Sequence, residues 1–333
     1  MVEFGMPSVR PMVYRFLFCA LLWTAETSSA PDVVTSASRA TPLLPPVSGG
    51  TTDTLIVGDS EIHVFIEDRP FDLSPEALQS WVRRSAEIVS LYYGGFPVPE
   101  AHVAIRGRRG PRVMNGRAFG HAGAVVNVDV GLLATPETLA NDWILIHELI
   151  HLGFPSLPRR HHWIEEGLSV YVESIARAKA GDLSTDTFWA GFLDGMPNGL
   201  PQSGDKGLDY THTWGRTYWG GALFCLLADI RIREQTDGQK TLRDALRGIA
   251  AGGYDITQSA DIRAVLQVAD QATGVNVLLE LYDEMRAAPL PTEIDSLWAN
   301  LGVARRAGKI IYDDDAPQAA IRRALTQQYG NIL

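Results

Sequence analysis

A run of five residues, His147-Glu148-Leu149-Ile150-His151, combines the residue types and the spacing that a hydrolytic metal site needs. If this run is helical, its two imidazole rings lie one turn apart on one face, with a carboxylate beside them. Neutral imidazole nitrogens are good zinc ligands, and a carboxylate can take a proton from a zinc-activated water. The run therefore predicts zinc held by His147 and His151, with Glu148 as general base.

The residues around this run predict that its helix is buried. Trp143, Ile144, Leu145 and Ile146 precede the first histidine, and leucine and isoleucine continue through the run. Two histidines and a carboxylate in a buried helix cost several kcal/mol if they are unpaired, and a bound metal removes that cost. The alternative is a pair of core histidines that are hydrogen-bonded to neighbouring groups.

A catalytic zinc ion takes three protein ligands and leaves its fourth position for water, so a further ligand is needed. Glu165 and Glu166 lie about 15 residues after His151, at the head of the next expected helix, and either carboxylate could supply it. The spacing of the metzincin class would require a glycine and a histidine at Phe154 and Leu157, which excludes that class.

Other titratable side chains near these residues have less specific roles. Asp142 and Glu173 could each accept a hydrogen bond from a ligating histidine ring, although Glu173 could equally be a surface carboxylate. His161 and His162 follow a proline and two arginines, which favours a loop position over metal binding. His121 precedes an expected strand, where it could contact substrate or occupy a turn.

The first half of the chain has the pattern of a sheet with one early helix. Strands are expected at 55–66, 98–106 and 124–130. The stretch 116–123 is expected to be a loop. Ser74 is a typical helix N-cap and Pro75 suits the first helical position, so a helix is expected to begin there. We place the β-rich half of the catalytic domain at 54–156.

Helices dominate the second half, 157–333. Thr135 and Pro136 are expected to begin the helix that carries His147, and this helix should end near Gly153. Later helices are expected at 163–180, 218–234, 242–249, 260–269 and 277–286. Together these elements predict an α+β fold, with a mixed β-sheet in the N-terminal half, an active-site helix, and a helical C-terminal half.

The composition excludes one class of partner. The 333 residues are enough for one large domain or two small ones, and 46% of them are hydrophobic, as in ordinary globular proteins. The formal net charge is −10, and the basic runs are short. Because a phosphate backbone is bound by clustered lysine and arginine, we expect no nucleic-acid partner.

Residues 1–30 have the pattern of an export signal, with two arginines, an apolar stretch at 16–23 and small residues before a cleavage site after Ala30. A disordered tail is the alternative. Residues 31–53, rich in Ser, Thr, Pro and Gly, are expected to be a flexible linker. The eight apolar residues are fewer than the roughly 20 that span a bilayer, so we expect an exported, periplasmic or extracellular protein without a stable membrane span. Cys225 would then be the only cysteine, without an internal disulfide.

The combination of HExxH with the downstream Trp163-Ile164-Glu165-Glu166-Gly167 resembles the gluzincin metallopeptidases. This resemblance implies a thermolysin-like zincin catalytic unit that holds one Zn²⁺ per chain. It implies that Glu166, the glutamate before the glycine, is the third ligand.

A second motif, which begins Tyr218-Trp219-Gly220-Gly221, is similar to the Y-x-K-G helix of the glycyl aminopeptidase (M61-like) catalytic domain. This similarity implies that the Tyr218 phenol stabilises the oxyanion of the transition state. Where those enzymes carry a glutamate that holds the substrate's free amine, this chain has Gly120. The lysine of their motif is Gly220 here. Endopeptidase activity and relaxed aminopeptidase activity therefore both stay open.

These observations lead to one prediction of function and one alternative. The prediction is an exported zinc-dependent peptidase whose peptide or protein substrate pairs with an edge strand near Ala124–Val130. The alternative is a catalytically inactive, peptidase-like zinc protein that acts as a binding module. The sequence predicts no particular oligomeric state.

Overall fold

The structure is a computed structural model that describes residues 49–330. The predicted signal peptide, residues 1–30, lies outside the described residues, as does the predicted linker up to residue 48. The last residues assigned to that linker, up to Asp53, already belong to the first strand. Among the helices of residues 49–330, none combines the length and apolar character that crossing a membrane requires.

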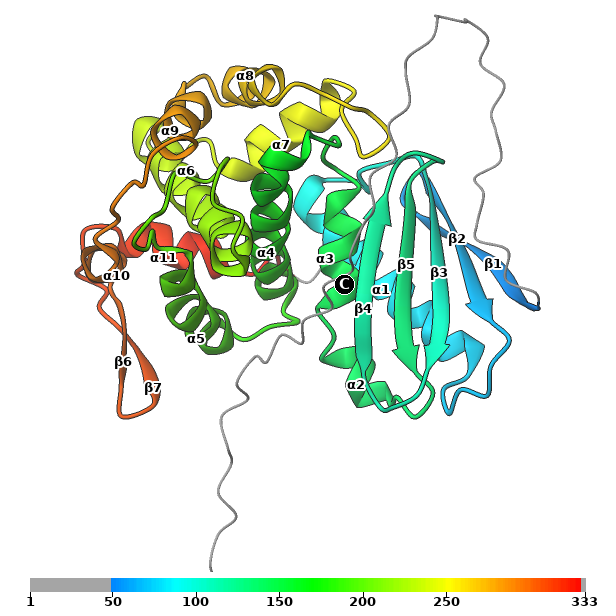
Figure 1. Cartoon of the computed structure of the whole chain (residues 1–333). Helices are drawn as coiled ribbons and strands as arrows, with labels where there is room; N and C mark the ends of the chain where they lie inside the picture. Colours follow the sequence, from blue (N-terminus) through cyan, green and yellow to red (C-terminus); the bar gives the residue numbers. More distant parts are fainter. Residues whose placement is uncertain (1–48, 331–333) are drawn as a thin grey trace, which may run out of the picture. The chain divides into compact units, whose positions relative to one another are not determined.

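A five-stranded mixed sheet forms the N-terminal half, as predicted (Figure 1). Its strands are β1 Gly50–Val57, β2 Ser60–Glu67, β3 Glu100–Arg108, β4 Val113–Phe119 and β5 Val125–Gly131. Their spatial order is β1-β2-β3-β5-β4. The central pairs, β2 with β3 and β3 with β5, are parallel, and the outer pairs are antiparallel. The sheet thus has β1 at one edge and β4 at the other.

The predicted edge strand near Ala124–Val130 is wrong. These residues form β5, which pairs with β3 on one side and β4 on the other, and all seven residues of β5 are buried. Even its polar residues Asn127 and Asp129 are buried, and Asp129 pairs with Arg106 and Arg108. The edge strand beside it is β4, whose residues 116–119 belong to the stretch that was expected to be a loop; glycine, as at position 116, is depleted in strands.

Helix α1, Pro75–Tyr93, covers one face of the sheet and confirms the predicted start. The Ser74 side chain accepts a hydrogen bond from the Ala77 amide, and Pro75 is the first helical residue. The helix ends where Gly94 adopts φ 85°, a left-handed conformation that glycine adopts without strain. Its buried face packs beside the inward-facing residues of the central strands.

The helix expected to begin at Pro136 is divided into two. Helix α2, Pro136–Ala140, ends at Asn141, and helix α3, Ile144–His151, begins three residues later. The Asp142 carboxylate accepts hydrogen bonds from the amides of Ile144 and Leu145, which have no partner within the helix. The divided helix therefore gives the histidine-bearing turns their own N-terminus.

The C-terminal half is helical, as predicted, with one small hairpin that was not predicted. Its α-helices are α4 His162–Ala180, α5 Thr185–Gly195, α6 Gly221–Gln235, α7 Leu242–Ala251, α8 Ile262–Thr273, α9 Val277–Met285, α10 Ile294–Leu301 and α11 Ala319–Thr326. Its shorter elements are the 3-10 helices Arg159–His161 and Met196–Gly199, the π-helix Gly215–Gly220, and the hairpin strands β6 Val303–Arg306 and β7 Lys309–Tyr312. Figure 1 shows α3 between the sheet and this group of helices.

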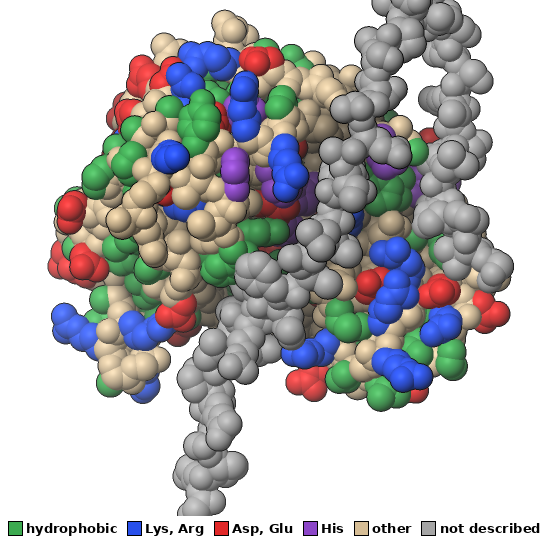
Figure 2. Space-filling model, viewed as in Figure 1, with side chains coloured by type: hydrophobic (Ala, Val, Ile, Leu, Met, Phe, Trp, Pro, Cys, Tyr) green, Lys and Arg blue, Asp and Glu red, His purple; other side chains and the backbone are tan. Residues whose placement is uncertain are grey.

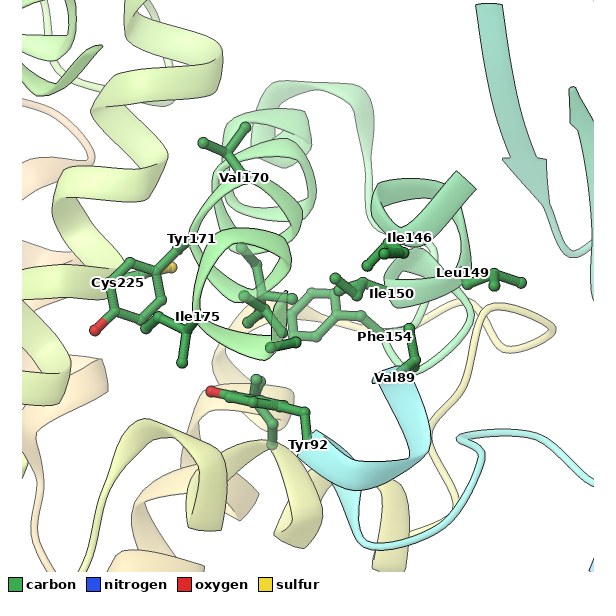
Figure 3. Packing of buried hydrophobic residues seen from close by; sticks show 14 of the residues in the cluster. Val89, Tyr92, Ile146, Leu149, Ile150, Phe154, Val170, Tyr171, Ile175 and Cys225 are labelled. Atoms are coloured by element: carbon green, nitrogen blue, oxygen red, sulfur yellow. The ribbon is translucent and has the colours of Figure 1, made fainter. Parts of the chain in front are cut away.

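One hydrophobic core continues from the sheet into the helices. Figure 3 shows Val89 and Tyr92 of α1, Ile150 of α3, Phe154 just after it and Ile175 of α4 pointing toward one another. All five side chains are buried. Because the core holds α3 from several sides, its two histidines have a rigid support.

Candidate active site

The three predicted metal ligands lie together at the crossing of α3 and α4. Oε2 of Glu166 is 3.1 Å from Nε2 of His147 and 3.7 Å from Nε2 of His151. One ligand atom from each of the three residues lies within 4.8 Å of the other two. The tertiary structure thus brings Glu166 to the histidine pair from a separate helix.

This donor set fits a zinc ion. It offers two imidazole nitrogens and one carboxylate oxygen, which are the ligand types of a catalytic zinc site. Burial raises the pKa of Glu166, but hydrogen bonds with His147, His151 and His162 outweigh burial and hold that pKa well below its ordinary value. The carboxylate is therefore ionised, as a metal ligand must be.

Glu165, the other possible third ligand, points elsewhere. Its Oε1 accepts a hydrogen bond from the Leu157 amide at 3.0 Å. Its Oε2 lies 3.1 Å from Nδ1 of His162. The group that could hold a metal includes Glu166 and omits Glu165.

Glu148 lies between α3 and the edge strand β4. A Cβ atom placed on Gly116 would come within 2.4 Å of Cγ of Glu148, so glycine is needed for this side chain to keep its present position. Burial raises the pKa of Glu148, while the charges of His151 and His147 and a hydrogen bond from the Ala118 backbone lower it. A carboxylate with a raised pKa beside the ligand group is suited to accept and release a proton.

Tyr218 approaches the same group from the π-helix Gly215–Gly220. Burial raises the pKa of its phenol, and the charges of Glu166 and Glu148 and a hydrogen bond with Glu166 raise it further. The phenol therefore stays protonated at neutral pH and can donate a hydrogen bond. Short π-helical segments are frequent at functional sites.

Glycines set the close contact that brings Tyr218 to Glu166. A Cβ atom on Gly167 would lie 2.2 Å from Cα of Gly221, and one on Gly221 would lie 2.0 Å from the Trp163 carbonyl oxygen. The backbones of α4 and α6 thus touch directly. The glycines of the two sequence motifs act together, since each motif supplies one side of this contact.

His162 belongs to the site, which the sequence interpretation missed. It is the first residue of α4, and its ring lies between two carboxylates, with Nε2 3.2 Å from Oε1 of Glu166. Hydrogen bonds to Glu165 and then to Glu166 raise the pKa of His162 to about 10. The signal available in the sequence was the four-residue spacing from His162 to Glu166, which puts both side chains on one helix face.

Asp142 and Glu173 are not bonded to a ligating histidine. Asp142 caps the start of α3. Glu173 accepts a hydrogen bond from Nη1 of Arg177 at 2.9 Å and another from the Ser174 hydroxyl. Within residues 49–330, Nδ1 of His147 has no hydrogen-bond partner. The two carboxylates stabilise the helices that carry the site.

His161 is buried and is not part of the group of predicted metal ligands. Its Nδ1 is 2.9 Å from the Asp209 carboxylate, which also accepts hydrogen bonds from the Trp163 indole and the Tyr282 hydroxyl. This network fixes the start of α4. His121 is exposed and stacks on Phe119 at the end of the edge strand, with ring centroids 5.3 Å apart.

Gly120, where the resembling enzymes have their amine-holding glutamate, is enclosed by a distant loop. A Cβ atom here would lie 1.8 Å from the Ile256 carbonyl oxygen. The segment after α7 therefore approaches the end of β4 so closely that no side chain fits. Figure 2 shows histidine side chains around a hollow between the helices and the sheet, where acidic side chains also reach the surface.

No family model matches the chain, and no curated protein matches its sequence. Solved structures do match. An aminopeptidase N family protein from Idiomarina loihiensis is 13% identical with a TM-score of 0.58, and the match covers 76% of this chain and 49% of that one. A mutant of the M1 zinc metallopeptidase from Deinococcus radiodurans is 16% identical with a TM-score of 0.50, covering 73% of this chain and 53% of that one.

These comparisons establish a shared fold. This chain spans about half the length of these two proteins. The mixed sheet followed by helices is the part of the fold that this chain shares with them, and the gluzincin resemblance stays a prediction. The thermolysin-like detail and the narrower resemblance to the glycyl aminopeptidase (M61-like) group stay predictions.

Proposed function

We propose that this protein is a zinc-dependent peptidase that hydrolyses peptide bonds. The observation that carries the proposal is the convergence of His147, His151 and Glu166, whose ligand atoms lie within 4.8 Å of one another. Zinc metallopeptidases among the structures with this fold support the same class of reaction. A zinc ion, when bound by these residues, would polarise the scissile carbonyl and activate water.

Glu148 is the proton carrier in this proposal. Its carboxylate accepts a proton from the attacking water and then delivers it to the departing amine. Burial keeps its pKa raised, which makes the carboxylate a better proton acceptor. A purely structural metal site would need no buried carboxylate next to its ligands, so the position of Glu148 argues for catalysis over simple binding.

The edge strand β4 is the proposed docking site for the substrate backbone. Among the described strands it pairs only with β5, so its other edge has backbone groups available for an extended peptide. Because Glu148 lies against Gly116 of this strand, a peptide paired there would pass close to the proton carrier.

Tyr218 is the proposed donor to the oxyanion. Its protonated phenol faces the same carboxylates and comes from the opposite side of the site, on the helical half. A hydrogen bond that strengthens as negative charge develops lowers the barrier to reaction.

The enclosed Gly120 shapes the proposed specificity. With the Ile256 carbonyl against its Cα, this position cannot carry the carboxylate that would hold a substrate's free amine. We therefore propose endopeptidase or relaxed aminopeptidase activity. We also propose that the protein is exported. Mass spectrometry of the N-terminus of the secreted protein would test that, with a start near Pro31 as the expected result.

The decisive experiment compares zinc content and peptide cleavage in the wild type and in Glu148→Gln. The variant should keep its zinc and lose on the order of 10²–10⁴ in rate, the contribution of a general base. Glu137→Gln, an exposed change on α2, is the matched control and should leave both quantities unchanged. If the zinc-loaded wild type cleaves nothing in a broad peptide library, the proposal is wrong and the protein is a catalytically inactive binding module.

A further inference from the structure

A second group of metal-binding side chains lies on the sheet, apart from the active site. Strand β2 contains Glu61-Ile62-His63, and strand β3 contains Glu100-Ala101-His102. The strands are parallel and neighbouring, and their register pairs glutamate with glutamate and histidine with histidine. The same Glu-x-His pattern therefore occurs twice, side by side.

All four side chains lie on one face of the sheet. Successive residues of a strand point to opposite faces of the sheet. Ile62, between Glu61 and His63, and Ala101, between Glu100 and His102, are fully buried and face inward. Glu61, His63, Glu100 and His102 therefore occupy the outer face, away from the packed helices. One ligand atom each from His63, Glu100 and His102 lies within 4.8 Å of the others.

The distances centre on the Glu100 carboxylate. Its Oε1 lies 3.2 Å from Nε2 of His63 and 3.5 Å from Nε2 of His102. The two rings are stacked, with centroids 4.8 Å apart. Glu61 adds a second carboxylate, 3.9 Å from Nε2 of His63. Two imidazole nitrogens and a carboxylate thus converge from adjacent strands.

His102 has no hydrogen-bond partner in its present surroundings. Its residue is only 8% exposed, and neither ring nitrogen is hydrogen-bonded within residues 49–330. A buried, unsatisfied imidazole is costly unless it finds a partner, and a metal ion would be one.

His63 is held in an orientation suited to a ligand. Its Nδ1 lies 2.9 Å from the Thr54 hydroxyl of β1. Metal-binding histidines typically use one ring nitrogen in this way and bind through the other. Within the described part of the chain, neither Glu61 nor Glu100 forms an ion pair with lysine or arginine, so their charge is left for a cation.

We propose that His63, Glu100 and His102 form a second site for a divalent transition metal, with Glu61 beside it. Imidazole nitrogens with one carboxylate select Zn²⁺, Ni²⁺, Co²⁺ or Cu²⁺ over Mg²⁺ and Ca²⁺, which prefer all-oxygen sites. Because the ligands come from β2 and β3, the ion would fasten this parallel strand pair. The site would stabilise the fold and would not act on substrate.

Equilibrium dialysis against buffered micromolar Zn²⁺, followed by elemental analysis, tests this proposal. The wild type should bind two ions per chain. Glu100→Gln and His63→Ala, both at partly exposed positions, should bind one and keep peptide cleavage. His151→Ala should also bind one, because it loses only the active-site ion. His212→Ala removes an exposed histidine outside both groups and should still bind two.

A thermal melt gives a second readout. Zinc added beyond the first equivalent should raise the Tm of the wild type and leave that of Glu100→Gln unchanged, since a metal that binds only the folded state stabilises it. The proposal is overturned if His151→Ala binds no ion, or if both sheet variants bind as many ions as the wild type. His151→Ala separates the sites, because its remaining ion reports on the sheet whether or not the protein is a peptidase.

Discussion

Gly116→Ala should remove most of the proposed activity without unfolding the protein. The added Cβ would lie 2.4 Å from Cγ and 2.7 Å from Oε1 of Glu148. Carbon atoms pack comfortably at about 3.5 Å, so the Glu148 side chain has to move by roughly 1 Å. The three atoms nearest to the added Cβ all belong to the Glu148 side chain, so this side chain can yield in place of the backbone.

The size of the loss follows from that displacement. A misplacement of about 1 Å in a reacting group costs roughly 10²-fold in rate, or about 2.7 kcal/mol. The proposed metal ligands belong to α3 and α4, and none of their atoms is among the three nearest to a Cβ on Gly116, so zinc binding should be retained. The expected pattern is therefore a large fall in kcat/KM with full zinc content and a normal circular dichroism spectrum.

The assay measures kcat/KM on a cleaved peptide, with zinc content determined on the same samples. Gly191→Ala on α5 is the control, because a Cβ there meets no atom within 4 Å. A Gly116→Ala enzyme within about twofold of wild type would refute the argument that glycine is needed to seat Glu148.

Three further predictions address the ligand, the substrate and the free thiol. Glu166→Ala should lose the active-site zinc while Glu165→Ala keeps it; equal zinc in both variants, measured by elemental analysis, would mean that the third ligand is wrong. Acetylated and free peptides should have similar kcat/KM, because losing a buried charged hydrogen bond costs about 1.5–3 kcal/mol, or roughly 10- to 150-fold, and Gly120 offers none to lose. A preference for free over acetylated peptides as large as that range would show that another acid holds the substrate's amine. Burial, and then the charge of Asp229, raise the pKa of the Cys225 thiol. Cys225 should therefore react with alkylating reagents only after unfolding, and rapid labelling of the native protein would contradict its buried position.

The local parts of the site were predictable because their signals lie within a few residues. The four-residue spacing of His147 and His151 puts both rings on one helix face, whatever surrounds the helix. Ser74 followed by Pro75 determines a helix start, because the Ser74 side chain accepts a hydrogen bond from the amide of Ala77 three residues later. The valines of β5 predicted a strand, although not that the strand is buried between β3 and β4.

The partners of these elements were decided only by tertiary structure. β4 became the edge because β3 and β5 pair directly and leave it one neighbour, and its own residues carry no sign of that order. The break between α2 and α3 depends on the Asp142 carboxylate, which accepts hydrogen bonds from the first amides of α3. The unpredicted hairpin β6–β7 likewise involves only four residues in each strand, too few for a clear pattern.

By itself, the sequence determined which residues can bind a metal and move a proton, because those properties belong to side chains and to spacing along one helix. Only the tertiary structure decided that Glu166 reaches the histidines, that Gly116 seats Glu148, and that Ile256 closes over Gly120. Each of these contacts joins separate segments of the chain. The Glu166 carboxylate lies close enough to both histidines to share a metal ion with them, and at Gly116 and Gly120 an added Cβ atom would overlap the opposite segment. Such close approaches depend on how whole elements pack, and no local pattern of residues encodes them.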